Sequence, residues 1–206
     1  MAATLLLSVL LMGFSIGLLH ALDADHLMTI SSLAARPDRG VATMRYAGLW
    51  ALGHGGLLIA IACAGLLLGW SLPVRLPASA ERLVGVVLIF AGASGIVSTL
   101  RRDGASGGVS AGIRSRMPFL IGMIHGTASS AAMMALIPLA LLGPVLGIAF
   151  VTIFSFGVLS AMMAFGFALE RGQQWLTARR PQLLRAVHMS VGIGAIGMGV
   201  FWLQTA

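Results

Sequence analysis

Residues 4–34 read TLLLSVLLMGFSIGLLHALDADHLMTISSLA, an apolar run that four ionisable side chains interrupt near its middle. A membrane-spanning helix needs about 20 consecutive apolar residues. The run is therefore too long for one upright span, and we expect it to tilt, to protrude or to be broken near its middle. No basic residue precedes the apolar part, as one would in a secretory signal peptide, so we expect a retained span.

The composition of the whole chain also indicates a lipid bilayer as its surroundings. Of the 206 residues, 58% are hydrophobic and 9% are charged, whereas a soluble domain has about 25% charged residues. We expect an all-α, polytopic membrane protein with about six transmembrane helices, forming a single domain over residues 1–206. The further apolar stretches lie near 46–70, 83–100, 118–142, 144–169 and 184–203.

The basic residues predict the orientation of these helices. All of them are arginines, and only Arg75 and Arg82 lie outside the first, third and fifth connections between the apolar stretches. Positive residues are enriched in cytoplasmic loops. The distribution therefore predicts a multi-pass protein of the plasma (inner) membrane with both termini extracytoplasmic. Because the arginines flank membrane spans, they do not indicate a nucleic-acid partner.

Two short similarities suggest an internal repeat. Residues 17–21 (GLLHA) resemble residues 122–126 (GMIHG), and residues 83–85 (LVG) resemble residues 190–192 (SVG) at nearly the same offset. Halves 1–105 and 106–206 with three spans each would be inverted relative to each other in the membrane. Transporters built from such 3+3 inverted repeats bind their substrate where the halves meet.

The interruption of the first run contains His20, Asp23, Asp25 and His26. Each Asp at the centre of a span costs roughly 2.5–3.5 kcal/mol on insertion scales. On an ideal helix, His20, Asp23 and His26 share an arc of about 120°, and Asp25 points to nearly the opposite side. One metal ion could take ligands from the first three, and Asp25 and backbone carbonyls could join if the helix unwinds. The alternative is that these groups pair with one another and lock helices together.

Two further histidines, His54 and His125, are flanked by glycine inside apolar stretches. Imidazole with carboxylate suits nickel, cobalt, zinc or copper, whereas magnesium and calcium prefer oxygen ligands. We predict that the second and fourth spans bring at least one of these two histidines within about 8 Å of the cluster, because one helix face cannot close a coordination shell. The glycines could equally serve helix packing. His188, near Arg185, is interpreted as interfacial or structural.

The stretch from His20 to His26 (HALDADH) resembles the H-A-x-D-A-D-H signature of the nickel/cobalt transporter (NiCoT) family. This resemblance implies that His20, Asp23, Asp25 and His26 recognise the metal. The family's G-H-S motif reads GHG around His54, and its later Asp/Thr-rich motifs have no clear counterpart. The chain looks more like the compact six-span branch of urease-accessory-type nickel permeases than like the usual eight-span members.

Together these features predict a permease, not an enzyme, that moves Ni²⁺ or Co²⁺ as substrate through a midmembrane site and needs no cofactor. The chain contains no lysine, so it cannot hold the lysine of a phosphate-binding Walker A loop. Active transport would use an ion gradient, the membrane potential or a separate energising subunit. A homo-oligomer or an accessory subunit remains open as a partner.

Other classes of protein are also compatible with parts of the sequence. Residues 92–95 (GASG), with Ser94, and the distant His188 resemble the serine–histidine pair of rhomboid intramembrane proteases. Small residues separated by serine are, however, ordinary in packed membrane helices, and a protease leaves the His/Asp cluster unexplained. An exporter of metal or of a small anion is a third reading, in which the acidic groups favour a cation.

Overall fold

The computed structural model describes residues 2–35, 43–68, 76–101, 111–127 and 142–205. Every regular element in these ranges is an α-helix, which confirms the all-α prediction. The helices are α1 (Ala2–His20), α2 (Ala24–Ala34), α3 (Thr43–Leu68), α4 (Leu76–Leu100), α5 (Ala111–Gly126), α7 (Pro144–Arg179) and α8 (Pro181–Thr205).

Four of these helices, α3, α4, α7 and α8, are long and apolar enough to cross a membrane. Helices α1 and α2 pass the same test only as a pair bent by 54°, which makes them either one broken span or a re-entrant loop. The long first run is therefore broken near its middle, one of the three outcomes expected. The described residues thus contain four or five membrane-capable spans, compared with the six that the sequence predicts. Most of the predicted span 118–142 cannot be compared, because residues 128–141 lie outside the described residues.

The break between α1 and α2 is a tight turn that ends at Asp23. The Leu22 amide donates to the Leu19 carbonyl (3.0 Å) and the Asp23 amide to the His20 carbonyl (3.1 Å). Asp23 is the N-cap of α2 and has extended backbone angles (φ −58°, ψ 141°). Asp25 follows in the first turn of α2, where a negative charge interacts favourably with the positive end of the helix dipole.

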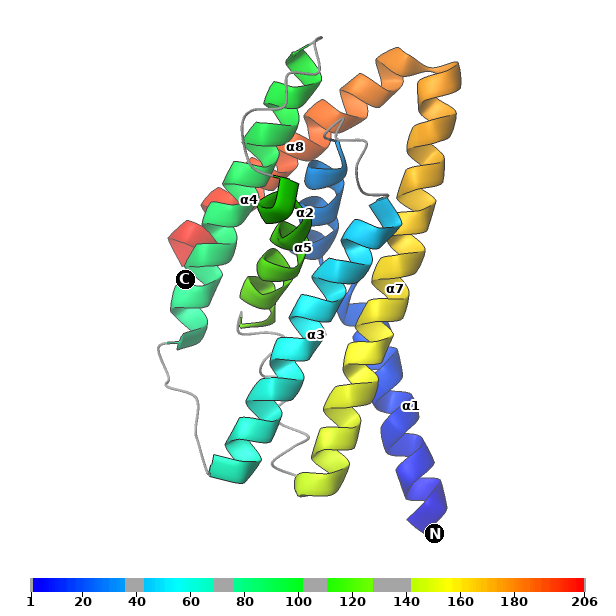
Figure 1. Cartoon of the computed structure of the whole chain (residues 1–206), viewed down its shortest axis with the longest axis vertical. Coiled ribbons are helices and arrows are strands. Elements are labelled where there is room, and N and C mark those ends of the chain that lie inside the picture. Colours follow the sequence, from blue (N-terminus) through cyan, green and yellow to red (C-terminus); the bar gives the residue numbers. More distant parts are fainter. Residues whose placement is uncertain (1, 36–42, 69–75, 102–110, 128–141, 206) are drawn as a thin grey trace.

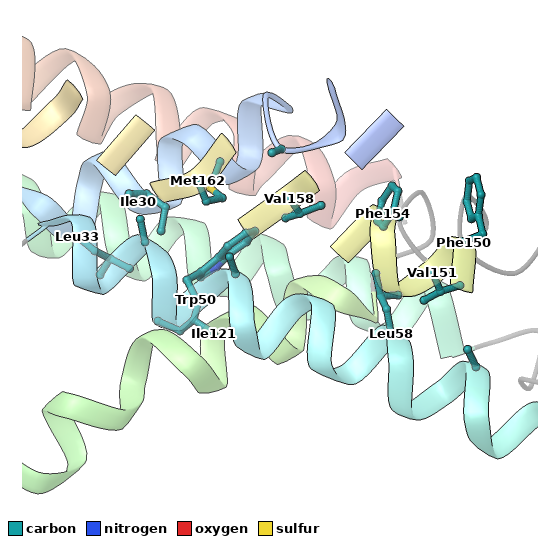
Figure 2. Packing of buried hydrophobic residues seen from close by; sticks show 14 of the residues in the cluster. Ile30, Leu33, Trp50, Leu58, Ile121, Phe150, Val151, Phe154, Val158 and Met162 are labelled. Carbon is teal, nitrogen blue, oxygen red and sulfur yellow. The ribbon is translucent and has the colours of Figure 1, made fainter. Parts of the chain in front are cut away.

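The helices pack in two groups that α2 connects. Helix α3 packs against α7 and α5, and α7 also packs against α1; α4 packs mainly against α8. Helix α2 contacts α4, α8 and α3. The turn that precedes α2 therefore lies in the middle of the bundle (Figure 1). The larger apolar core, shown in Figure 2, includes the fully buried Trp50, Phe150 and Phe154.

Glycines allow three pairs of helices to approach closely. A Cβ atom added to any of these glycines would meet the backbone of the facing helix, so the helices could not lie as close with a larger residue there. The facing pairs are Gly17–Phe154 and Gly157–Phe14 between α1 and α7, Gly122–Trp50 and Gly53–Phe119 between α5 and α3, and Gly85–Gly199 and Gly92–Gly192 between α4 and α8.

Helix α7 is longer than the span predicted for it. Its 36 residues correspond to about 54 Å, whereas the hydrocarbon core of a bilayer is about 30 Å thick. Near this extension, the Glu170 carboxylate accepts a hydrogen bond from the Met44 amide (3.3 Å) at the start of α3. The start of α3, the end of α4 and the α7–α8 junction lie toward one end of the bundle (Figure 1). The arginine-rich connections leave from these helix ends, and their cytoplasmic location stays a prediction.

Candidate metal centre

Four buried histidines from four helices meet at the α1–α2 break. His20 ends α1, His26 lies in α2, His54 in α3 and His125 in α5, and none is more than 3% exposed. The ring centroid of His26 lies 4.8 Å from that of His20, 5.3 Å from that of His54 and 5.8 Å from that of His125. The His20 and His54 centroids are 5.4 Å apart. Helices α3 and α5 thus bring both glycine-flanked histidines to the cluster, as the sequence predicts.

Two carboxylates border these imidazoles. The Asp23 carboxylate lies 2.9 Å from His20 Nδ1, and the Asp25 carboxylate lies 3.8 Å from His26 Nε2. One ligand atom from each of His20, Asp23 and His26 can be chosen so that all lie within 4.8 Å of one another. The sequence predicts this grouping on one arc of a continuous helix. In the structure the same three residues meet across the break, which also leaves Asp25 beside His26.

Backbone carbonyls fix which nitrogen of two rings is free to bind a metal. His26 Nδ1 lies 3.1 Å from the His20 carbonyl and His125 Nδ1 lies 3.0 Å from the Ile121 carbonyl. A carbonyl can only accept a hydrogen bond, so each Nδ1 carries the proton and each Nε2 keeps its lone pair. Metal-binding histidines are commonly oriented in this way by a second hydrogen bond. The His20 carbonyl is available to His26 because the helix breaks there.

A hydroxyl group lies beside the free nitrogen of His125. Thr29 Oγ1 is 3.2 Å from His125 Nε2 and 2.7 Å from the Asp25 carbonyl. Its single proton can be donated to only one of these acceptors at a time. Thr29 therefore links α2 to α5 without holding the His125 lone pair permanently.

Three ring nitrogens of the cluster have neither a hydrogen-bond nor an ion-pair partner in the described part of the chain: Nε2 of His20 and both ring nitrogens of His54. An unsatisfied buried polar group costs about 1–3 kcal/mol, and most buried polar groups in proteins are paired. A cluster that only locks helices together would pair its own groups. The unpaired nitrogens therefore favour ligand binding over the locking alternative.

Trp50 forms one wall of the site and was not anticipated from the sequence. Its fully buried indole is stacked on His54, with centroids 5.2 Å apart and 21° between the planes. It also lies 4.9 Å from the ring of His26 and 5.3 Å from that of His125. Trp50 lies four residues before His54, so both side chains are on one face of the helix. This spacing was the sequence feature that could have pointed to Trp50 as part of the site. On another side, the Phe154 ring lies 5.4 Å from that of His20.

The residues of the protease alternative do not form a pair. Ser94 donates to the Ala91 carbonyl one turn earlier (2.8 Å), and His188 lies 3.4 Å from the side-chain amide of Gln173. No hydrogen bond joins Ser94 to His188 in the described part of the chain. His188 also makes no ring contact with the four-histidine cluster there. The predicted separation of His188 from the cluster agrees with this placement.

Comparison with known proteins gives distant relatives. No protein-family model and no solved structure matches the chain. Urease accessory protein UreH of Bacillus sp. (strain TB-90) is 27% identical over 171 residues, which cover 78% of this chain and 75% of that protein. Chloroplast protein FOR GROWTH AND FERTILITY 2 of Arabidopsis thaliana is 27% identical over 204 residues, which cover 91% of this chain but 54% of that protein. The chain is thus similar to a urease accessory protein over most of its length.

Proposed function

We propose that this protein is a membrane permease for a divalent transition metal ion, Ni²⁺ or Co²⁺. The observation that carries the proposal is the meeting of four buried imidazoles from four helices, three of whose nitrogens have no partner in the described residues. Imidazole nitrogens with nearby carboxylates are the donors that such ions prefer. A site built from several helices can also release its ion when those helices move.

Two observations favour nickel or cobalt over zinc. The HALDADH stretch resembles the signature of nickel/cobalt transporters, and the four ionisable residues of that stretch surround the site. The similarity to a urease accessory protein extends over most of the chain and agrees with the resemblance to urease-accessory-type nickel permeases. These observations support the proposal that the chain belongs to that branch, with the metal ion as its substrate and not as a resident cofactor.

The close approaches at glycine support the proposed inverted repeat. Exchanging the two halves converts the Gly17–Phe154 contact of α1 with α7 into the Gly122–Trp50 contact of α5 with α3. The same exchange converts the Gly85–Gly199 contact into Gly192–Gly92. Helices α1 and α5 run in opposite directions along the bundle (Figure 1). Such an arrangement is typical of transporters with a substrate site between inverted halves.

Metal uptake by intact cells tests the proposal directly. Cells expressing the wild type should accumulate more Ni²⁺ or Co²⁺ than cells with an empty vector, and His26→Ala should abolish the difference at an unchanged amount of membrane protein. His188→Ala serves as the matched control and should transport normally, since His188 contacts Gln173 outside the cluster. Lower accumulation than in the empty-vector cells would instead indicate export. An unchanged uptake by His26→Ala would refute the site.

A further inference from the structure

We propose that Trp50 determines the metal specificity of this site by excluding water from the bound ion. The indole would select ions that accept a shell of protein nitrogens and reject ions that keep their water. This inference rests on the proposed function, because it concerns the same site. It adds a role for a residue that offers no ligand atom.

The position of Trp50 supports this role. Its ring lies within 5.3 Å, centroid to centroid, of three of the four histidine rings, and it is 0% exposed. Ile30, Val158 and Met162 belong to the same apolar cluster (Figure 2). An ion among the histidines would therefore have an aromatic and aliphatic wall on the Trp50 side, where water would otherwise complete its shell.

Exclusion of water separates the candidate ions by their chemistry. Mg²⁺ gives up its water reluctantly and prefers an octahedral oxygen shell. Mn²⁺ binds nitrogen ligands more weakly than Co²⁺ or Ni²⁺ in the Irving–Williams order. A wall that removes water ligands and leaves imidazoles thus acts against Mg²⁺ and Mn²⁺, and it has much less effect on Ni²⁺ or Co²⁺.

Filling of the core alone does not account for tryptophan at this position. The indole Nε1–H is buried and has no acceptor among the described residues, whereas buried tryptophan N–H groups usually find a partner. Phenylalanine would fill much of the same space without a buried, unpaired donor. The larger indole is stacked on His54 and contacts the rings of His26 and His125 at steep angles (61° and 67°), which offers a reason for its presence.

Binding measurements on the purified, full-length protein in detergent test the proposal. Trp50→Ala should lower the ratio of Ni²⁺ to Mn²⁺ affinity by about tenfold or more, because water regains access to the ion. Trp202→Ala is the matched control: Trp202 also has a buried, unpaired indole N–H but packs with α4 and α8 in a separate apolar cluster. It should leave the ratio unchanged.

Tryptophan fluorescence tests the position of the ion beside Trp50, on which the inference depends. Ni²⁺ and Co²⁺ have partly filled d shells and quench nearby indoles, whereas Zn²⁺ has a filled d shell and serves as the non-quenching reference. Ni²⁺ should quench the wild type and Trp202→Phe. The same concentration should not quench Trp50→Phe.

The outcomes distinguish this inference from the proposed function. If the wild type binds no Ni²⁺, the proposed function is wrong. If it binds Ni²⁺ but Trp50→Ala keeps the wild-type ratio, only the role of Trp50 is wrong. Should Trp50→Ala fail to fold, Trp50→Phe decides. Quenching that persists in this variant refutes the inference, because the ion then does not lie beside Trp50. Loss of quenching together with a lowered ratio of Ni²⁺ to Mn²⁺ affinity supports it, and an unchanged ratio refutes it.

Discussion

Replacing His54 with leucine should raise the stability of the metal-free protein. It should also remove most of the additional stability that the wild type gains when it binds metal. His54 is 0% exposed, is stacked on Trp50, and neither of its ring nitrogens has a hydrogen-bond partner in the described residues. Leucine is apolar and of similar size, so it removes a buried donor and a buried acceptor without opening a large cavity. It also removes a metal ligand.

The magnitude follows from these contacts. Each unsatisfied polar group costs about 1–3 kcal/mol, and the lost stacking is worth about 0.5–1.5 kcal/mol. We therefore expect the free energy of unfolding of the metal-free protein to rise by about 2 kcal/mol. In a chain of this length that change raises the melting temperature by about 4–8 °C.

Thermal unfolding of the detergent-solubilised protein, with Ni²⁺ or with a chelator, measures both effects. At a Ni²⁺ concentration of about 100 times the dissociation constant, the wild type should gain about 2.7 kcal/mol from binding. His54→Leu should lose most of this gain. His188→Leu is the control and should keep it, since His188 lies apart from the cluster beside Gln173.

The opposite pattern would refute the reasoning. If His54→Leu melts below the wild type in chelator and keeps the full stabilisation by Ni²⁺, His54 contributes to packing and not to metal binding. The unpaired nitrogens would then have to be satisfied by a partner outside the described residues.

Three further results are expected. Asp23→Asn should weaken Ni²⁺ binding by about 10–100-fold in equilibrium dialysis, because the carboxylate beside His20 Nδ1 (2.9 Å) orients that ring. Gly122→Ala should lower the melting temperature by overpacking against the Trp50 backbone, at about 1–3 kcal/mol, whereas Gly56→Ala, whose Cβ would meet nothing within 4 Å, should not. Reporter fusions should place the α7–α8 junction in the cytoplasm and the C-terminus outside; the reverse result would overturn the orientation inferred from the arginines.

Composition predicted the helical class, and the length of the first run left a break as one of three expected outcomes, beside tilt and protrusion. A run of 31 residues is too long for one span, and four ionisable groups in its middle need partners inside the protein. The exact place of the break could not be predicted. Ala21 and Leu22 are good helix formers, so the turn depends on tertiary contacts such as that of His26 with the His20 carbonyl (3.1 Å).

Other features could not be predicted because their residues look ordinary in sequence. Trp50 is apolar within an apolar helix, and only its three-dimensional neighbours distinguish it from any other core residue. The span predicted at 144–169 continues as helix to Arg179. Its last part is polar, and hydropathy alone ends the span there, although glutamate, arginine and glutamine favour helix. The partnership of Glu170 with the start of α3 connects residues 126 positions apart, which no local pattern reveals.

The length of α7 offers a practical route to an experimental structure. A chain of 21.3 kDa, mostly enclosed by detergent, gives little signal for aligning single particles. Helix α7 continues without interruption to Arg179, and α8 begins two residues later at Pro181, so this junction can accept a rigid helical fusion domain on both sides. Its exposed position, away from the four histidines, should leave the metal centre intact while the added mass makes the particles visible.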